Sequence, residues 1–408
     1  MRFTALGAIV KEYGGIIQTG PFGSQLHQND YTEHGIPVVM PKDIRGGRVD
    51  ESCVARIPET KAQALSRHLL KVGSIVFPRR GEINKCAYIG EDQIGYLCGT
   101  GCLKIETPET ILRSKFLYYY LGIGQVVKWL ERNAVGTTML NLNTKILGGI
   151  SVPLLSLNTQ DRIISILSAY DDLIENNRQR IQLLEQAARL LYKEWFVNLR
   201  FPGHEHVKII DGVPEGWERK KIADVCETVG GGTPSTRVTE YWDGDITWVV
   251  PSDVTKNDCL VLLDSERKIT EKGLRESSAK MVPAETILMT SRASVGYFAL
   301  MDQAVCTNQG FINIIPYRNE LRMYLLFHLM DRVNEIRSNA KGTTYPEISK
   351  GRFREMDVMI PLKPLVHEFG IFAGNIVQQV RCLKRSIQQL SNARDLLLPR
   401  LMNGEIAV

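Results

Sequence analysis

The side chains that could do chemistry in this sequence are scattered cysteines, histidines and carboxylates. Cys98 and Cys102 form a close pair, but no second pair or nearby histidine completes a zinc site, which favours reduced, buried thiols. His204 and His206 flank a glutamate in a stretch with proline and glycine, and their spacing differs from the i, i+4 pair of helical zinc sites. No Gly-x-Ser-x-Gly motif places a serine nucleophile. We therefore predict no metal site and no nucleophile.

Enzymes that act on DNA also leave motifs, and these are missing. An amino-group methyltransferase needs an Asn/Asp-Pro-Pro-aromatic loop, yet the sequence holds no Pro-Pro dipeptide. The glycine run at residues 230–234 lacks the Gly-Lys-Ser/Thr ending of a phosphate-binding loop, which favours a flexible loop. Residues 59–61 (Glu-Thr-Lys) have a nuclease-like spacing without a preceding Pro-Asp. The sequence thus predicts no catalytic centre and no cofactor of its own.

Side chains that could read DNA bases are more abundant. Arginine pairs with guanine, and asparagine or glutamine pairs with adenine, when loops beside a sheet present them. In the first half of the chain the candidates are Lys42, Arg45, Arg48, Arg79, Arg80 and Lys85. In the second half they are Thr236, Arg237, Ser252, Asp253, Ser291, Arg292, Asn308 and Gln309. Candidates for phosphate contacts are Thr137, Thr138, Lys341, Thr343 and Thr344. Each arginine could instead be a solvated or ion-paired surface residue, Asn308 and Gln309 could cap a strand, and the threonine loops could be plain turns.

An internal repeat organises these candidates. Residues 133–138 (Asn-Ala-Val-Gly-Thr-Thr) recur as residues 339–344 (Asn-Ala-Lys-Gly-Thr-Thr), an offset of 206 residues. A short alternating strand that ends in a proline, Pro153 or Pro361, follows each copy. The repeat predicts two halves built on one plan.

A heptad pattern follows each proline. Apolar or aromatic residues recur at alternating steps of four and three, except at Asn177 and Arg394. We call these positions the seam. In the first segment the seam includes Ile163, Leu167, Tyr170, Ile174, Ile181, Leu184, Ala188, Leu191 and Trp195. In the second it includes Phe369, Ala373, Ile376, Val380, Leu383, Ile387, Leu390, Leu397 and Leu401. Two long helices that pack on each other are therefore predicted.

The polar seam residue Arg394 indicates how the helices pair. An antiparallel pair places it near Tyr170, Asp171 and Asp172, whereas a parallel pair places it beside Ala188. A buried arginine needs an anionic or aromatic partner, so we expect the antiparallel arrangement, although Arg394 could also extend to solvent. At about 1.5 Å per residue the first helix spans roughly 50 Å, which suits a spacer.

The remaining sequence forms two similar mixed domains. Residues 75–80 parallel residues 287–292, and residues 97–101 parallel residues 305–309 with an offset of 208. Short β-rich runs and helical stretches near residues 113–132 and 320–338 predict an α/β (α+β) fold. The expected parts are a first domain at 1–150, a helical region at 151–200, a linker at 201–216, a second domain at 217–357 and a second helical region at 358–408.

Composition limits the class of protein. The 408 residues are 44% hydrophobic and 23% charged, which describes a folded protein long enough for two domains. The net charge of +5 permits nucleic-acid binding. The sequence has no apolar segment of signal-peptide type at its start and no run of about 18 apolar residues, so we expect a cytoplasmic protein without membrane contact.

Together these features resemble the specificity subunit of type I restriction-modification systems. The resemblance covers the whole chain and is most specific from Gly136 to Trp195 and from Gly342 to Ile406, including the terminal Leu-Pro-Arg-Leu-Met-Asn-Gly-Glu-Ile at residues 398–406. It implies a subunit that reads a bipartite target in double-stranded DNA, one half with each target-recognition domain. It also implies two methyltransferase subunits that bind S-adenosylmethionine, and restriction subunits that use ATP and Mg²⁺ for translocation and cleavage.

Two other classes remain open at this point. A stand-alone DNA-modifying enzyme with an unusual site would need motifs that the sequence lacks. A coiled-coil adaptor that binds only protein would explain the helices but not two diverged domains with basic loops.

Overall fold

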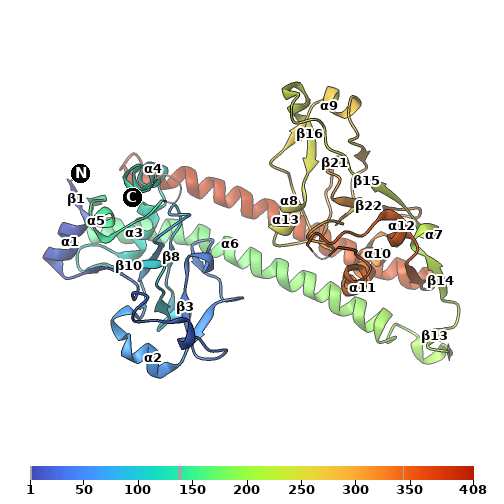
Figure 1. The fold of residues 1–408 in the computed structure, drawn as a ribbon, viewed down its shortest axis with the longest axis horizontal. Helices are drawn as coiled ribbons and strands as arrows, with labels where there is room; N and C mark the ends of the chain where they lie inside the picture. The colour runs from blue at the N-terminus through green and yellow to red at the C-terminus, as the bar shows by residue number, and fades with distance from the viewer. Residues whose placement is uncertain (1, 137–139, 343) are drawn as a thin grey trace. The chain divides into compact units, whose positions relative to one another are not determined.

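Residues 2–136, 140–342 and 344–408 are described by the computed structural model. The chain divides into two units: unit 1 comprises Met1–Asp172 and Leu390–Val408, and unit 2 comprises Leu173–Gln389. Both boundaries lie inside long helices, so each unit holds one globular domain and a segment of each helix (Figure 1). The expected linker at 201–216 lies within unit 2, where β12 (Ile209–Ile210) and β13 (Val213–Pro214) form a small hairpin.

The two heptad segments form the long helices α6 (Leu157–Tyr192) and α13 (Lys363–Met402). A π-helical turn at Lys193–Val197 follows α6. The first helix is 36 residues long because it begins before the seam, where the Ser156 hydroxyl accepts a hydrogen bond from the Thr159 N–H at 3.2 Å. All the seam residues named above are buried or half-buried, and none of them is exposed.

Contacts within each unit show that the helices pair antiparallel. In unit 1, Leu167 near the start of α6 shares a core with Leu401 near the end of α13. In unit 2, Tyr192 at the end of α6 packs on Phe369 near the start of α13, with ring centroids 5.9 Å apart. The prediction for the polar seam position is confirmed, because Arg394 Nη1 lies 2.6 Å from an oxygen of Asp171.

The globular domain of unit 1 is built on two small sheets. The strand order is β2-β10-β7-β8 in an antiparallel sheet and β6-β3-β9 in a mixed sheet, where β3 and β9 are parallel. The strands are β2 (Ile16–Thr19), β10 (Cys102–Glu106), β7 (Ile75–Pro78), β8 (Ala87–Tyr88), β6 (Ala55–Ile57), β3 (Ile36–Val39), β9 (Leu97–Cys98), and the hairpin β4 (Ile44–Arg45) with β5 (Arg48–Val49). The first strand, β1 (Arg2–Ala5), pairs with β11 (Ser151–Leu154) and closes the domain.

Unit 2 repeats this plan. Its sheets have the orders β15-β22-β19-β20 and β17-β16-β21-β18, and β16 and β21 are parallel, as β3 and β9 are in unit 1. The strands are β15 (Cys226–Gly230), β22 (Phe311–Pro316), β19 (Ile287–Thr290), β20 (Phe298–Ala299), β17 (Lys268–Ile269), β16 (Trp242–Val249), β21 (Val305–Thr307) and β18 (Met281–Val282). The strand β14 (Glu218–Lys221) pairs with β23 (Asp357–Ile360) and closes the domain as β1 and β11 do. The predicted mixed fold with an internal repeat is confirmed.

Shorter helices cover the sheets. Both predicted helical stretches are present, each as two helices: α3 (Ser114–Leu121) and α4 (Gly124–Asn133), then α10 (Leu321–Asp331) and α11 (Val333–Ser338). The others are α1 (Leu6–Tyr13), α2 (Glu59–Ala64), α5 (Thr144–Gly148), α7 (Ile222–Val225), α8 (Pro251–Thr255), α9 (Glu271–Arg275) and α12 (Lys350–Arg354). Within the described part of the chain, no helix is long and apolar enough to cross a membrane.

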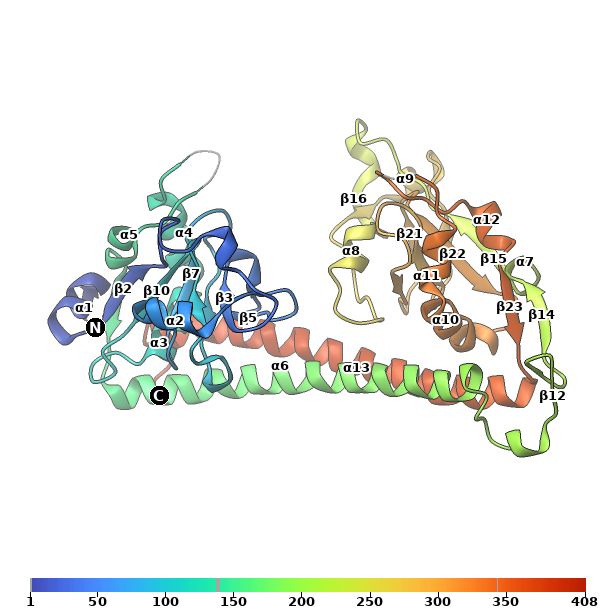
Figure 2. The same cartoon turned by 60° about the horizontal axis from the view of Figure 1, so that its bottom comes forward.

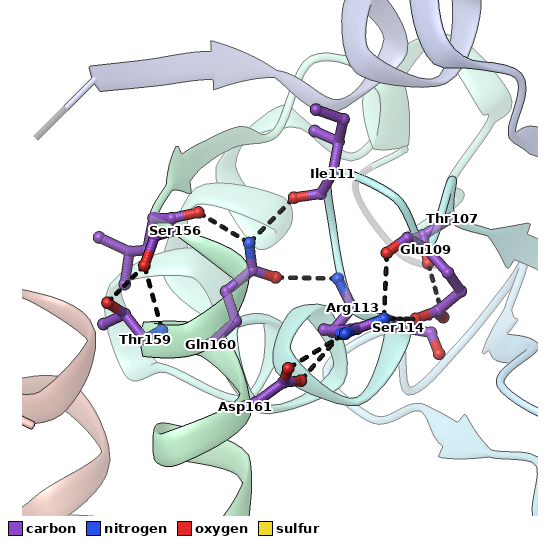
Figure 3. A network of polar contacts seen from close by, with 10 residues as sticks. Thr107, Glu109, Ile111, Arg113, Ser114, Ser156, Thr159, Gln160 and Asp161 are labelled. Carbon is purple, nitrogen blue, oxygen red and sulfur yellow. Dashed lines mark hydrogen bonds and ion pairs between the residues drawn. The ribbon is translucent and has the colours of Figure 1, made fainter.

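A buried polar network joins the first turn of α6 to the domain of unit 1 (Figure 3). The fully buried amide of Gln160 donates to the carbonyls of Ile111 and Leu155, both at 2.9 Å, and accepts from the Arg113 N–H at 2.8 Å. The guanidinium of Arg113 binds both oxygens of Asp161, at 2.8 and 3.0 Å. These directional bonds fix the orientation of the domain on its helix.

In unit 2, ion pairs and hydrogen bonds attach both long helices to the globular domain. The buried Arg381 of α13 pairs with Glu285 at 2.7 Å and with Asp302 at 3.6 Å. Lys384 donates to Asn257 at 2.9 Å. Glu185 of α6 accepts the Leu260 N–H at 2.5 Å, and burial raises the pKa of its carboxyl group. Both helices are thus tied to the second domain by polar contacts.

Candidate nucleic-acid interface

In unit 2, several of the polar residues predicted from the sequence meet where strands of both sheets end. The Ser291 N–H donates to the carbonyl of Gly310 at 2.7 Å, and the Gly310 N–H donates to the side chain of Asn308 at 2.8 Å. The backbone of Asn308 in turn donates to Val249 at 2.9 Å. The side chain of Asn308 therefore accepts a hydrogen bond within the turn after β21, and its backbone links this turn to the end of β16.

Arg292 and the repeated threonine loop lie next to this point. Arg292 Nε lies 2.7 Å from a carboxylate oxygen of Glu347, and both side chains are nearly half exposed. The backbones of Lys341 and Glu347 exchange two hydrogen bonds of 2.9 Å, which closes the loop into a hairpin. Thr344 is exposed on that hairpin, and Thr343 lies outside the described residues. The hairpin that carries Lys341 and Thr344 is therefore linked to Arg292 through the Glu347 ion pair.

Unit 1 contains the same arrangement with different side chains. The Arg79 N–H donates to Gly101 at 2.7 Å, which matches the bond of Ser291 to Gly310. Arg80 forms an isolated bridge with Asn141, as Arg292 does with Glu347. The loop after α4 carries Thr137 and Thr138, which lie outside the described residues.

The strand register corrects one detail of the sequence alignment. Val39 pairs with Cys98, and Val249 pairs with Thr307, so Cys98 corresponds to Thr307. The offset here is 209, from 98 to 307, and the expected offset of 208 is wrong by one residue. Gly99, rather than Thr100, is therefore the counterpart of Asn308.

Lys42 and Ser252 occupy equivalent exposed positions beside these junctions. Each precedes an aspartate whose carboxylate accepts a backbone N–H at 2.9 Å, Asp43 from Met40 and Asp253 from Val250. Asp253 also accepts the Ser265 hydroxyl at 2.7 Å. The structure thus shows the carboxylate of Asp253 acting as a helix cap.

The short helices that carry Lys42 and Ser252 touch the glycines of the junctions. A β-carbon on Gly101 would lie 2.9 Å from Pro41, and one on Gly310 would lie 3.0 Å from Pro251. Lys42 therefore adjoins the loop that binds Arg79, and Ser252 adjoins the loop that binds Ser291.

Three predicted residues of unit 1 lie elsewhere. Arg45 pairs with Asp50 at 3.0 Å, Arg48 pairs with Asp92 at 2.5 Å, and Lys85 pairs with Glu82 at 2.6 Å. The turn between Arg45 and Arg48 and the side chain of Lys85 line a pocket of about 310 Å³ whose other wall includes Asp171 and Arg394 of the long helices. The structure does not bring these three side chains together with Arg79 and Arg80.

Thr236, Arg237 and Gln309 are exposed in unit 2. The Thr233 hydroxyl binds the side chain of Gln309, and the Arg237 N–H donates to Ser235 Oγ at 3.4 Å. The Ser235 carbonyl accepts the indole N–H of Trp242 at 3.1 Å. The loop that begins with the glycine run at 230–232 is therefore held by defined contacts rather than left loose.

The sequence reasoning missed one exposed residue, Arg267. Its guanidinium carbon lies 3.9 Å from the ring centroid of Trp242 and 5.2 Å from that of Trp248. No motif marks it, because its tryptophan partners are distant in sequence and become neighbours only through the pairing of β16 with β17.

Among the described residues, no group of three or more histidine, cysteine or acidic side chains is placed to hold a metal ion. Cys98 and Cys102 are both buried, and burial raises the pKa of Cys98 to about 12 and that of Cys102 well above its usual value. Both thiols therefore stay protonated at neutral pH.

Comparisons with known proteins agree with this duplicated arrangement. The family model described as type I restriction modification DNA specificity domain matches residues 28–186 and again residues 214–379. The MjaIX specificity subunit of Methanocaldococcus jannaschii is 40% identical over 154 residues, which cover 37% of this chain and 36% of that subunit. The HindI specificity subunit of Haemophilus influenzae is 23% identical over 418 residues, which cover 86% of this chain and 90% of that subunit.

The fold itself is shared with a solved structure. The crystal structure of the S subunit of a type I restriction-modification system from M. genitalium aligns with a TM-score of 0.56 and 17% identity, over 98% of this chain and 95% of that chain. Since the family model matches most of the chain in two copies, the chain belongs to the family that carries the type I restriction modification DNA specificity domain.

Proposed function

We propose that this chain is the DNA-recognition subunit of a type I restriction-modification complex and reads a bipartite target with one domain for each half. The observation that carries the proposal is the duplicated junction, in which Arg80 bridges Asn141 just after β7 and Arg292 bridges Glu347 just after β19. Arginine is the commonest side chain for guanine contacts, and threonine hydroxyls and backbone N–H groups suit phosphate.

The differences between the two junctions support separate half-site specificities. Arg79 of unit 1 corresponds to Ser291 of unit 2, and Asn141 corresponds to Glu347. The backbone hydrogen bonds are the same, while the hydrogen-bonding groups of the side chains differ. A common frame with different side chains is the arrangement expected of two domains that read different sequences.

The long helices have two roles in this proposal. Each contributes residues to both units, which supports a spacer that sets the separation of the half-sites. Large apolar side chains are also exposed on both helices, among them Leu183 and Leu190 of α6 and Ile371 and Leu396 of α13. We propose that the methyltransferase subunits bind to the exposed faces of the two long helices.

Catalysis belongs to the partner subunits in this proposal. The methyltransferase subunits would bind S-adenosylmethionine, and the restriction subunits would bind ATP and Mg²⁺, in the cytoplasm where the DNA lies. The absence from the sequence of methyltransferase and nuclease motifs supports the assignment of a non-catalytic role to this chain.

The test is to express the chain with and without the methyltransferase subunit of its own system and to map methylated adenines across genomic DNA. Methylation at one bipartite motif, only when both proteins are present, is the expected result. Methylation or cleavage by the chain alone would favour a DNA-modifying enzyme. An absence of methylation despite a stable complex of the two proteins would favour a protein-only adaptor.

A further inference from the structure

Arg267 of unit 2 is held between two tryptophans. Its guanidinium lies over Trp242 and reaches Trp248, and the two rings are 5.0 Å apart and nearly perpendicular, at 83°. Arginine stacks on indole rings through cation–π attraction, which is strongest with tryptophan. The stacking restricts the rotamers of a side chain that would otherwise be mobile on the surface.

The two rings are themselves fixed by the domain. The indole N–H of Trp242 donates to the Ser235 carbonyl at 3.1 Å, and that of Trp248 donates to the Gly232 carbonyl at 2.9 Å. Trp248 is buried, and its backbone N–H donates to the carbonyl of Arg267 at 3.0 Å. Both the main chain and the side chain of Arg267 are therefore positioned before any ligand binds.

The guanidinium has no ionic or hydrogen-bonding partner among the residues that the structure describes. Its neighbour Lys268, in contrast, pairs with Asp264 at 3.4 Å. Arg267 is exposed, so its N–H donors are available to a ligand. A fixed arginine with free donors loses little conformational entropy when it binds.

This feature is absent from the equivalent place in unit 1. Trp248 of β16 is opposite Arg267, the residue just before β17, as Val38 of β3 is opposite Ala55 of β6. Valine and alanine cannot form such a stack, so among the described residues this place in the shared frame carries the tryptophan–arginine pair in the second domain and not in the first. A position that differs on a shared frame is suited to discrimination between half-sites.

Arg267 lies near a loop whose residues are candidates for DNA contacts. Ser235, which binds Trp242, is followed directly by Thr236 and Arg237. Within unit 2, Figure 2 shows α9 and β16 at the end of the domain that lies away from the segments of α6 and α13. The stack is therefore part of a loop-rich surface and not of the helix-bound side of the domain.

We propose that Arg267, held by Trp242 and Trp248, reads a guanine in the major groove of the half-site that the second domain recognises. The inference rests on the proposed function and names one residue and one base for it. A planar guanidinium with two parallel N–H donors matches the O6 and N7 acceptors of guanine. No other base presents two such acceptors side by side in the major groove.

The test uses the complex of this chain with its methyltransferase subunit. Its binding is measured to DNA duplexes that carry the motif found by methylation mapping and to duplexes of scrambled sequence. Arg267→Ala should weaken binding to the motif by about ten- to hundred-fold and leave binding to the scrambled duplex within about two-fold. Arg267→Lys keeps the charge but loses the paired donors, so it should show nearly the same loss. The matched control is Arg318→Ala, which removes an exposed arginine of the same unit, in the turn after β22.

Replacing each guanine of the second half-site in turn by 7-deazaguanine locates the contact. At one position, 7-deazaguanine should weaken DNA binding by the wild-type complex. At the same position it should have no further effect on the Arg267→Ala complex. Equal losses on motif and scrambled DNA, or full rescue by Arg267→Lys, would show a phosphate contact and overturn the inference. Unchanged motif binding with a lowered melting temperature would show a purely stabilising stack and would also overturn it. If the unsubstituted complex itself prefers no motif, the proposed function fails instead.

Discussion

Replacement of Gln160 by alanine should selectively destabilise unit 1. The side chain is fully buried and makes three hydrogen bonds, to Ile111, Leu155 and Arg113, all with backbone groups (Figure 3). Each buried backbone group left without a partner costs about 1–3 kcal/mol, so the three together should cost at least about 3 kcal/mol. This is a large fraction of the stability of an ordinary domain.

Hydrogen exchange measured on peptides of each unit is the suitable assay, because a chain with two units need not unfold in one step. At about 1.4 kcal/mol per factor of ten, protection of the core amides of unit 1 should fall by roughly a hundred-fold or more. Peptides from residues 217–357 of unit 2 should keep their protection. The matched control, Gln125→Ala, removes an exposed glutamine of α4 in the same unit and should change stability by less than about 0.5 kcal/mol.

A second variant separates hydrogen bonding from packing. Gln160→Leu has a similar volume but cannot pair with the three backbone groups, so its loss should approach that of Gln160→Ala. Full protection in Gln160→Leu would show that the site needs only an apolar side chain. A loss below about 1 kcal/mol in both variants would refute the reasoning that the network orients and stabilises the domain.

Three further predictions concern DNA binding, the helices and pH. Arg80→Ala and Arg292→Ala should each weaken binding of the complex to its motif far more than to random DNA, whereas equal losses would reduce them to phosphate contacts. Insertion of one heptad into α6 alone should disrupt folding or assembly because part of the seam loses register, and a normally assembled, active mutant would contradict the spacer role. Burial lowers the pKa of His328 to about 3, while the unfolded chain binds this proton near pH 6.5. Acidification from pH 7 to pH 5 should therefore destabilise unit 2 by about 2 kcal/mol, and His328→Gln should remove this pH dependence as measured by urea unfolding at each pH.

The helices and the repeat could be predicted because their signals are periodic. Heptad spacing persists along each helix, and one charged seam residue, Arg394, needs a partner that only the antiparallel pairing supplies. The register of β9 and β21 was harder, because Gly99 and Asn308 have dissimilar side chains and the alignment depends on backbone hydrogen bonds. Both strands are buried at every position, so no alternation of apolar and polar side chains marks their register.

The polar contacts that fix each domain left no signal in the sequence. Gln160 lies off the seam, and its counterpart at the offset of 206, Val366, is apolar and buried, so the repeat does not point to it. The stack of Arg267 on Trp242 and Trp248 depends on strand pairing across a long connection. Such contacts are set by tertiary structure, whereas periodicity reports only which face of an element is covered.

The strand pairs β1–β11 and β14–β23 have an evolutionary consequence. Each brings the entry and exit of its domain side by side, with Phe3 opposite Pro153 and Arg219 opposite Met359. Everything between the paired strands is one uninterrupted stretch of chain that leaves the scaffold and returns to it at the same place. Recombination within these strands would exchange a whole domain as a cassette and leave the seam of the helices intact. A new half-site could thus be acquired in one genetic event, without prior adjustment of the rest of the protein.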